Sequence, residues 1–247
     1  VDGVAEYEQL KGGVETLFGK DAHTVLTNAG MAFQSAGMSM NEYMETSIQS
    51  AAALINSLEG DTTEAARLMD VSIIDMADNV NKMGTSMEGV QNAYRGFSRG
   101  NFTMLDNLAL GFAGTKDGMQ ELLDKAQELT GIEYNIDSYA DIVNAIHEVQ
   151  VAMDIAGTTK HEGADTIEGS LARTKAAWDN LITGMARDDV NLGALIDNLV
   201  NSASDAFNNI EPVIERALVC VGKFVSKAIP SLMQKLPHLI NEVLPEL

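Results

Sequence analysis

The chain has 247 residues, of which 45% are hydrophobic and 5% aromatic, and its formal net charge is -20. This charge argues against bulk binding to nucleic acid, because neutralising phosphates requires an excess of Lys and Arg. The single cysteine, Cys220, excludes an intrachain disulfide framework, and its apolar surroundings in the sequence predict a buried thiol. No apolar run reaches about 18 residues, which argues against an ordinary transmembrane helix.

The composition predicts an all-α protein with a multi-helix, bundle-like domain. Ala, Leu and Met favour helices, whereas the β-branched and aromatic residues that favour strands are fewer. Residues 1–210 hold 12 of the 16 Lys+Arg and 32 of the 36 Asp+Glu, and residues 211–247 hold four of each and all four prolines. We therefore expect an acidic helical core domain over 1–210 and a separate apolar helical segment over 211–247.

Signals for the start and end of helices alternate through the first 160 residues. A capping box at 39–42 predicts a helix to about Leu58. Further starts are expected at 61–64, 85–88, 115 and 138–141, with ends near residues 83, 100, 131 and 157. Each of these breaks carries a glycine, which is the residue that most readily adopts the left-handed cap conformation. Apolar residues spaced by three and four predict that helices continue through 139–153, 171–185 and 192–206.

The C-terminal segment carries a wide apolar face from Val213 to Ile229, interrupted by a few charged residues. Pro230, Pro237 and Pro245 are expected to divide the last part of the chain into short amphipathic pieces. This face either packs against other copies of the protein, which we favour, or lies in a membrane interface. Its candidate interaction residues are Val213, Ile214, Phe224 and Ile229.

The sequence contains no enzyme signature that we recognise. None of the four histidines belongs to an H-E-x-x-H motif, and one cysteine does not make a zinc cluster. We therefore predict no catalytic residue, no cofactor and no metal. Residues 157–160, Gly-Thr-Thr-Lys, lack the spacing of a phosphate-binding loop and are interpreted as a helix cap, and Gly12-Gly13 as a break between helices.

Aromatic residues provide the remaining candidates, all for packing. Arg95 and Arg99 flank Phe97 near Phe102 and Leu105, a patch that we assign to packing in preference to contact with nucleic acid. Trp178 is the only tryptophan and is predicted to be a buried anchor. If the ring is buried, Trp178→Ala should cost about 3–5 kcal/mol.

Several stretches in a fixed order, at residues 9–20, 36–44, 101–108, 138–143, 155–159, 175–181 and 210–240, resemble the tape measure proteins of long-tailed phages and prophages. The resemblance covers nearly the whole chain. It implies a structural protein of the phage tail that takes part in tail assembly, helps to set tail length and leaves the tail tube when DNA is ejected. Some family members also help to open the host envelope.

The same resemblance implies the partners and the location. The partners would be other copies of the chain, the tail tube, tail tip and assembly chaperone proteins and, as a further candidate, the host membrane, without specific nucleic-acid binding. The protein would be made in the bacterial cytoplasm and would end in the virion tail. The alternative is a membrane-active helical protein that perturbs the host envelope or forms a channel in it.

Length limits how directly this chain could act as a ruler. At a rise of about 1.5 Å per residue, a helix of 247 residues spans at most roughly 370 Å. Long phage tails are considerably longer, and the chain lacks the long uninterrupted coiled-coil region of a measuring rod. We therefore expect the folded portion of a longer protein.

Overall fold

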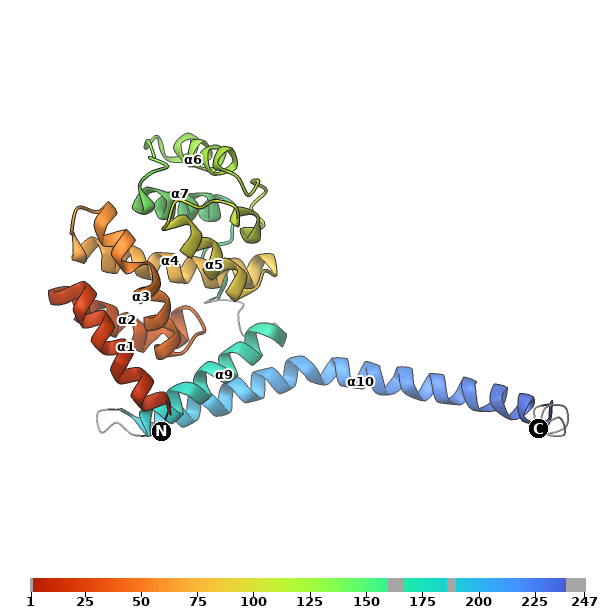
Figure 1. Cartoon of the computed structure of the whole chain (residues 1–247). Helices are drawn as coiled ribbons and strands as arrows, with labels where there is room; N and C mark the ends of the chain where they lie inside the picture. The colour runs from red at the N-terminus through yellow and green to blue at the C-terminus, as the bar shows by residue number, and fades with distance from the viewer. Residues whose placement is uncertain (1, 160–166, 186–189, 239–247) are drawn as a thin grey trace, which may run out of the picture. The chain divides into compact units, whose positions relative to one another are not determined.

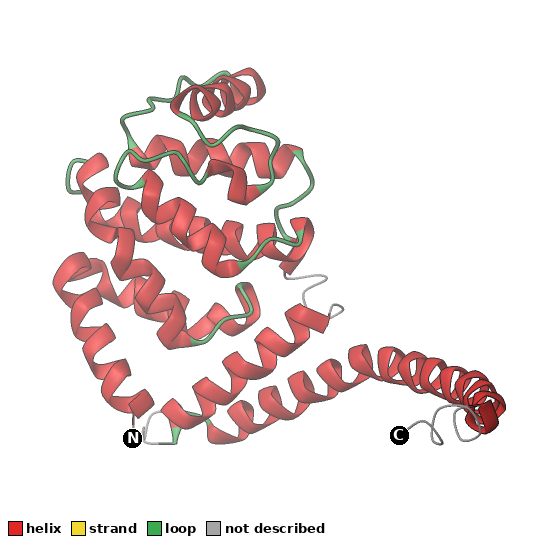
Figure 2. Ribbon diagram, turned by 45° about the vertical axis from the view of Figure 1, so that its right-hand side comes forward, coloured by secondary structure: helices red, strands yellow, loops and turns green. Residues whose placement is uncertain are grey.

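The computed structural model describes residues 2–159, 167–185 and 190–238, and within these ranges it contains helices and no strand (Figures 1 and 2). The predicted all-α class is therefore confirmed. The chain divides into two units, Val1–Ala206 and Phe207–Leu247, and each is described by itself. The division falls four residues before the compositional boundary at 210 and lies inside a helix.

The first unit is built from helices joined by short turns. In chain order the described helices are α1 (Asp2–Phe18), the 3-10 turn η1 (Gly19–Asp21), α2 (Ala22–Ser35), α3 (Met40–Ser57), α4 (Thr62–Met83), α5 (Met87–Phe97), η2 (Leu105–Leu108), α6 (Lys116–Thr130), α7 (Tyr139–Ala152), α9 (Ile167–Gly184) and α10 (Leu192–His238). Helix α3 packs against α1, α2 and α4, helix α4 also packs against α7, and α6 covers α7 (Figure 1).

Most helix ends confirm the predicted caps, although α7 ends at Ala152, before the predicted end near residue 157. The Ser39 hydroxyl accepts a hydrogen bond from the Glu42 N–H at 3.2 Å, and the Asp61 carboxylate accepts from two N–H groups of the first turn of α4. Gly84 and Gly131 follow α4 and α6 in the left-handed conformation, with φ of 67° and 74°. These ends depend on local chemistry, which explains why the sequence alone locates them.

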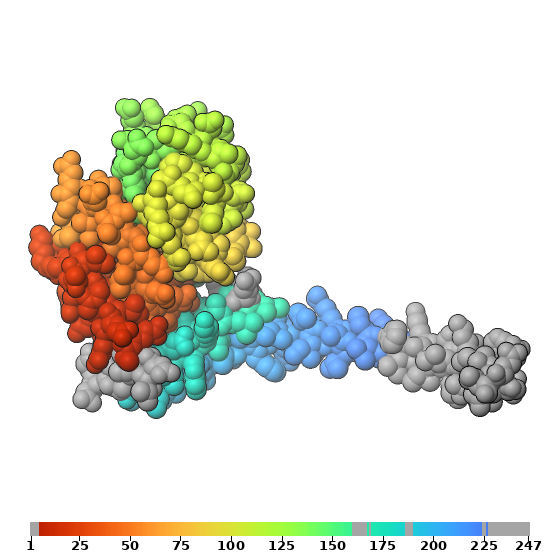
Figure 3. Space-filling model, viewed as in Figure 1, coloured from red at the N-terminus to blue at the C-terminus, as the bar shows by residue number. Residues whose placement is uncertain are grey.

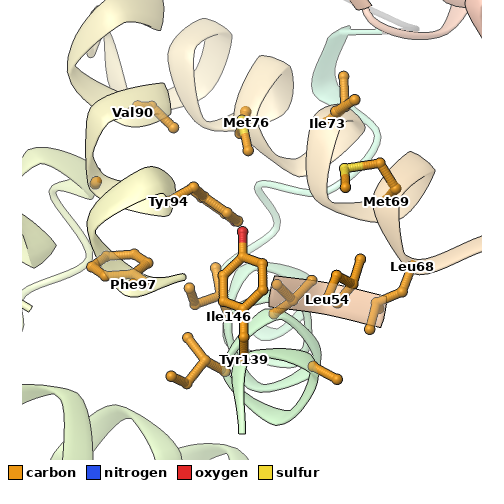
Figure 4. Close-up of a cluster of buried hydrophobic side chains, with 14 of the residues drawn as sticks. Leu54, Leu68, Met69, Ile73, Met76, Val90, Tyr94, Phe97, Tyr139 and Ile146 are labelled. Carbon is orange, nitrogen blue, oxygen red and sulfur yellow. The ribbon is translucent and has the colours of Figure 1, made fainter. Parts of the chain in front are cut away.

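The core of the first unit lies where α3, α4, α5 and α7 meet. Figure 4 shows side chains of all four helices converging there. Tyr94 and Phe97 of α5 have ring centroids 5.8 Å apart, and Phe102 lies 6.3 Å from Phe97, so the rings form a continuous aromatic cluster. Phe102 and Leu105 are both buried in this core, which confirms that they are packing residues.

Gly12 and Gly13 do not separate two helices, contrary to the sequence interpretation, because both lie inside α1. A Cβ atom at Gly13 would come within 2.8 Å of the Cδ1 atom of Ile48 on α3, whereas one at Gly12 would meet nothing within 4 Å. Gly13 therefore permits the close approach of α1 and α3.

The same substitution at these neighbouring positions is expected to have different effects. Gly13→Val should lower the free energy of unfolding by about 1 kcal/mol, because the terminal methyl group of Ile48 must move aside. Gly12→Val should change it by less than about 0.5 kcal/mol, because the position is exposed. Urea unfolding of the two variants measures the difference, and equal stabilities would contradict a close contact at Gly13.

Helix α10 is continuous from Leu192 to His238, so the prediction that Pro230 and Pro237 divide this region was wrong, and Pro245 lies outside the described residues. Pro212 lacks the N–H that would bond with the carbonyl of Asn208, and its ring crowds that carbonyl. Both residues are exposed, so water can satisfy the carbonyl without ending the helix.

A buried polar network joins α4 to α7 and to the segment after α7. The side chain of Asp75 is almost completely buried, and its two oxygens lie 2.9 and 3.0 Å from Nδ1 of His147. The Asn79 amide donates to Oε1 of Gln150 at 2.8 Å, and the Gln150 amide donates to the carbonyl of Asp75. These bonds fix the register of α7 on α4.

Candidate functional site

An apolar stripe runs along α10 within the second unit. It consists of Phe207, Ile210, Ile214, Ala217 and Val221, and we call these five residues the α10 stripe. Their spacing is three, four, three and four, which keeps one face of a helix apolar along its length. The sequence pattern of this stripe therefore matches the contact positions of a helix that pairs with other helices.

The α10 stripe is open to solvent. Phe207, Ile214 and Val221 are 62%, 48% and 58% exposed, and Val213 and Leu218 widen the apolar face on its two sides. The described part of the second unit consists of this one helix (Figure 3), so no other described element of that unit covers the stripe. Burying an isoleucine or phenylalanine side chain contributes about 1.5–3 kcal/mol, so the stripe is a strong surface for association.

The opposite side of the helix is mostly polar. It carries Asn208, Asn209, Pro212, Glu215, Arg216 and Lys223. Pro212 therefore points away from the stripe, where a missing backbone hydrogen bond does not disturb side-chain contacts. Because apolar residues also flank the stripe at 213 and 218, the apolar face is wider than a two-stranded coiled coil needs, which favours three or more helices.

The predicted candidates of this region fall into two groups. Val213 and Ile214 lie on the exposed apolar face. Phe224 and Ile229 belong to the backbone of α10, but their side chains lie outside the described residues. Cys220 is exposed, so its predicted burial was wrong: the apolar neighbours in the sequence do not cover it within the helix.

Among the helices of the described ranges, none is long and apolar enough to cross a bilayer. This finding does not bear on a helix lying in a membrane interface, which requires only an amphipathic face.

Trp178 is not the buried anchor that the sequence predicted. Its side chain is 52% exposed on α9, whose inner face instead buries the small residues Ala176 and Ala177 against Phe33. The ring borders a groove of about 490 Å³ that is also lined by α1, α3 and α5. The apolar periodicity of 171–185 identified a helix correctly but did not distinguish its two sides.

The stability effect of Trp178→Ala is therefore expected to be small. We expect a loss of less than about 1 kcal/mol, instead of the 3–5 kcal/mol typical of a buried ring, because half of the side chain already contacts water. Thermal unfolding measures this directly. A loss of several kcal/mol would show that the ring is covered in solution.

Two motifs noted in the sequence have structural roles. Phe97 and Phe102 are buried, so their rings do not offer a stacking surface to nucleic acid, and Arg95 bonds to the side chain of Gln49. The N–H groups of Gly157 and Thr159 donate to the two oxygens of Asp78, at 2.6 and 2.7 Å. The Gly-Thr-Thr segment thus holds a carboxylate of its own chain, in the place where a phosphate-binding loop would hold a phosphate.

His147 is hydrogen-bonded to the buried carboxylate of Asp75. Burial raises the pKa of Asp75 to about 6, with the hydrogen bond to His147 acting in the opposite direction. That bond in turn raises the pKa of His147 above its usual value. Because Asp75 lies 72 residues away, sequence spacing gave no signal of this pair.

The carboxylate of Asp75 contacts Nδ1 of His147, as the aspartate of a Ser–His–Asp triad contacts its histidine. Hydrolytic catalysis would also require a nucleophile beside the histidine. Among the described residues, His147 makes its hydrogen bonds to Asp75. No group of three or more His, Cys, Asp or Glu in the described ranges is arranged to hold a metal ion. The pair therefore joins α4 to α7.

Comparisons with protein-family models, with curated proteins and with solved structures found no match to this chain.

Proposed function

We propose that this chain is a structural component of a long-tailed phage or prophage particle, the folded portion of its tape measure protein. In this role it takes part in tail assembly and length determination and leaves the tail tube when DNA is ejected. The observation that carries the proposal is the exposed α10 stripe, an extended apolar surface on a long continuous helix. Such a surface suits a protein whose work is assembly with copies of itself.

The length of α10 also supports this role. With 47 residues and a rise of about 1.5 Å per residue, α10 is roughly 70 Å long. The described chain thus includes a long rod-like element of a kind that the sequence did not lead us to expect. We infer that several copies pair along this helix, which the acidic first unit precedes in the chain.

The charge distribution supports the proposal as well. The first 210 residues carry the whole net charge of -20. A protein of this charge does not bind DNA through phosphate contacts, which suits a protein that must leave a conduit before DNA passes through it. High net charge also favours solubility, so this argument is secondary to the α10 stripe.

The test of the proposal is mass spectrometry of purified tailed particles from the bacterium that carries this sequence. The tryptic peptide 176–187 contains Trp178 and identifies the chain. We expect this peptide in intact tails at a small fraction of the amount of the tube protein. Its absence from intact tails would overturn the proposal.

The second candidate function is that of a membrane-active protein, and the same exposed apolar residues favour it. Leakage from dye-loaded anionic and neutral liposomes separates the two functions. The membrane function predicts leakage by the wild-type chain and none by a chain that ends at residue 210. No leakage from either chain would exclude it, and leakage without self-association would place it first.

A further inference from the structure

The groove beside Trp178 is lined by four helices of the first unit. Its lining is mostly polar and includes Glu6 of α1; Glu42, Glu45, Thr46 and Gln49 of α3; Gln91 and Arg95 of α5; and Lys175, Trp178, Asp179 and Ile182 of α9. Lys175 and Ile182 lie three residues before and four residues after Trp178, so one stripe of α9 faces the groove. The indole ring is thus an exposed flat surface beside the side chains of Thr46, Gln49, Gln91 and Arg95, which we call the polar wall.

The side chains of the polar wall are hydrogen-bonded to one another in two pairs. Arg95 donates through Nε to Oε1 of Gln49 at 3.2 Å and also bonds to it through Nη2. The Gln91 amide donates to the hydroxyl of Thr46 at 3.1 Å. Each of these side chains has more donors and acceptors than these bonds use. The groove therefore presents hydrogen-bonding groups in fixed positions.

The charges of the groove restrict the class of ligand. Four carboxylates, those of Glu6, Glu42, Glu45 and Asp179, outnumber the two cations Arg95 and Lys175, so a phosphate or another small anion would be repelled. The apolar lining is limited to Trp178 and Ile182, which is too little for an apolar peptide or a lipid chain. Burial raises the pKa of the Glu42 carboxyl above its usual value.

We propose that this groove binds an uncharged, hydroxyl-rich ligand, namely two or three sugar units of a glycan. The C–H face of a pyranose is apolar and stacks on an exposed indole ring, as Trp178 offers. Vicinal hydroxyls both donate and accept, and they match the paired amide, guanidinium and hydroxyl groups of the polar wall. The proposal is independent of the phage-tail function, because it depends only on the first unit.

Tryptophan fluorescence of the full chain tests this directly, because Trp178 is the only tryptophan. The probes are N,N',N''-triacetylchitotriose and maltotriose, with trilysine and inorganic phosphate as charged comparisons. We expect a saturable shift of the emission by at least one trisaccharide, with a dissociation constant in the millimolar range. Failure of both trisaccharides to give a saturable shift, or a response to trilysine or phosphate alone, overturns the proposal.

Variants separate binding from folding. Arg95→Ala is expected to weaken trisaccharide binding about tenfold, since it removes hydrogen bonds to the ligand. Trp178→Ala, followed by isothermal titration calorimetry or saturation-transfer NMR, is expected to abolish detectable binding. Met185→Ala is the matched control, because Met185 is an exposed residue of the same unit that does not line the groove. Binding by Trp178→Ala equal to that of Met185→Ala contradicts the proposal, even if the fluorescence of the wild type responds.

Discussion

The Ile214→Glu variant is expected to be monomeric at concentrations at which the wild-type chain self-associates. Ile214 lies at the centre of the α10 stripe, so each copy in a helical assembly would have to bury a carboxylate without a partner. We expect association to weaken at least about 100-fold, which corresponds to roughly 2.7 kcal/mol. Sedimentation equilibrium over a range of protein concentrations measures the change.

Val219→Glu provides a matched control for this result. Val219 is also exposed on α10 and is similar in size, but it lies on the side of the helix away from the stripe. It should leave the association constant nearly unchanged. Equal effects of the two substitutions would mean that the stripe is not the contact surface, and a monomeric wild type would remove the basis for self-association through α10.

The His147→Ala variant is expected to be markedly less stable than the wild type, with a loss of about 2 kcal/mol near neutral pH. Removing one partner of a buried ion pair costs about 3–5 kcal/mol, and the partial exposure of the His147 side chain reduces this value. The loss arises because the buried carboxylate of Asp75 then has no cation beside it. Urea unfolding measures it, and the double variant Asp75→Asn/His147→Ala should recover most of the stability.

The same pair predicts a definite dependence on pH. The pKa of Asp75 is about 6 in the folded chain against 3.8 as its ordinary value, and the pKa of His147 lies above 6.5. Both groups therefore bind protons more tightly in the folded state. The stability that each group contributes is fully present at pH values below its ordinary pKa. It is lost as pH rises, first through the pKa of Asp75 at about 6 and then through the raised pKa of His147.

Stability measured from about pH 5 to about pH 9 tests this sign. The difference in free energy of unfolding between the wild type and the Asp75→Asn/His147→Ala variant should fall as pH rises. The double variant is the proper reference, because the other carboxylates of this acidic chain titrate in both proteins. A difference that grows with pH would show that the pair is not formed as described.

The sequence predicted those parts of the fold that depend on local chemistry. Ser39 and Asp61 begin helices by accepting hydrogen bonds from N–H groups two and three residues away, and Gly84 ends one by adopting a positive φ. Such signals need no knowledge of the rest of the chain. The same rules failed at Gly13, which lies inside α1 against Ile48, and at Pro230 and Pro237, through which α10 continues.

The candidate surfaces were harder to predict. Periodicity showed that residues 171–185 form a helix, but not that its small residues, Ala176 and Ala177, face the protein while Trp178 faces solvent. The large size of the Trp178 side chain suggested that it was buried, whereas the close approach of α9 to Phe33 requires small side chains such as those of Ala176 and Ala177. The three–four spacing of the α10 stripe was present in the sequence, but the assumption that prolines end helices concealed its continuity.

Cys220 can report whether two copies of α10 pair in the same direction or in opposite directions. The exposed thiol is the only one in the chain, so any disulfide must join two copies. In a parallel, in-register pair the two sulfurs lie at the same level but on opposite sides of the stripe, because Cys220 directly precedes the contact residue Val221. In an antiparallel pair centred on Ile214 they are separated along the axis by about 18 Å, twice the rise of six residues. Cross-linking of Cys220 with a short and a long bismaleimide, followed by electrophoresis, therefore distinguishes copies that point the same way from copies that oppose each other.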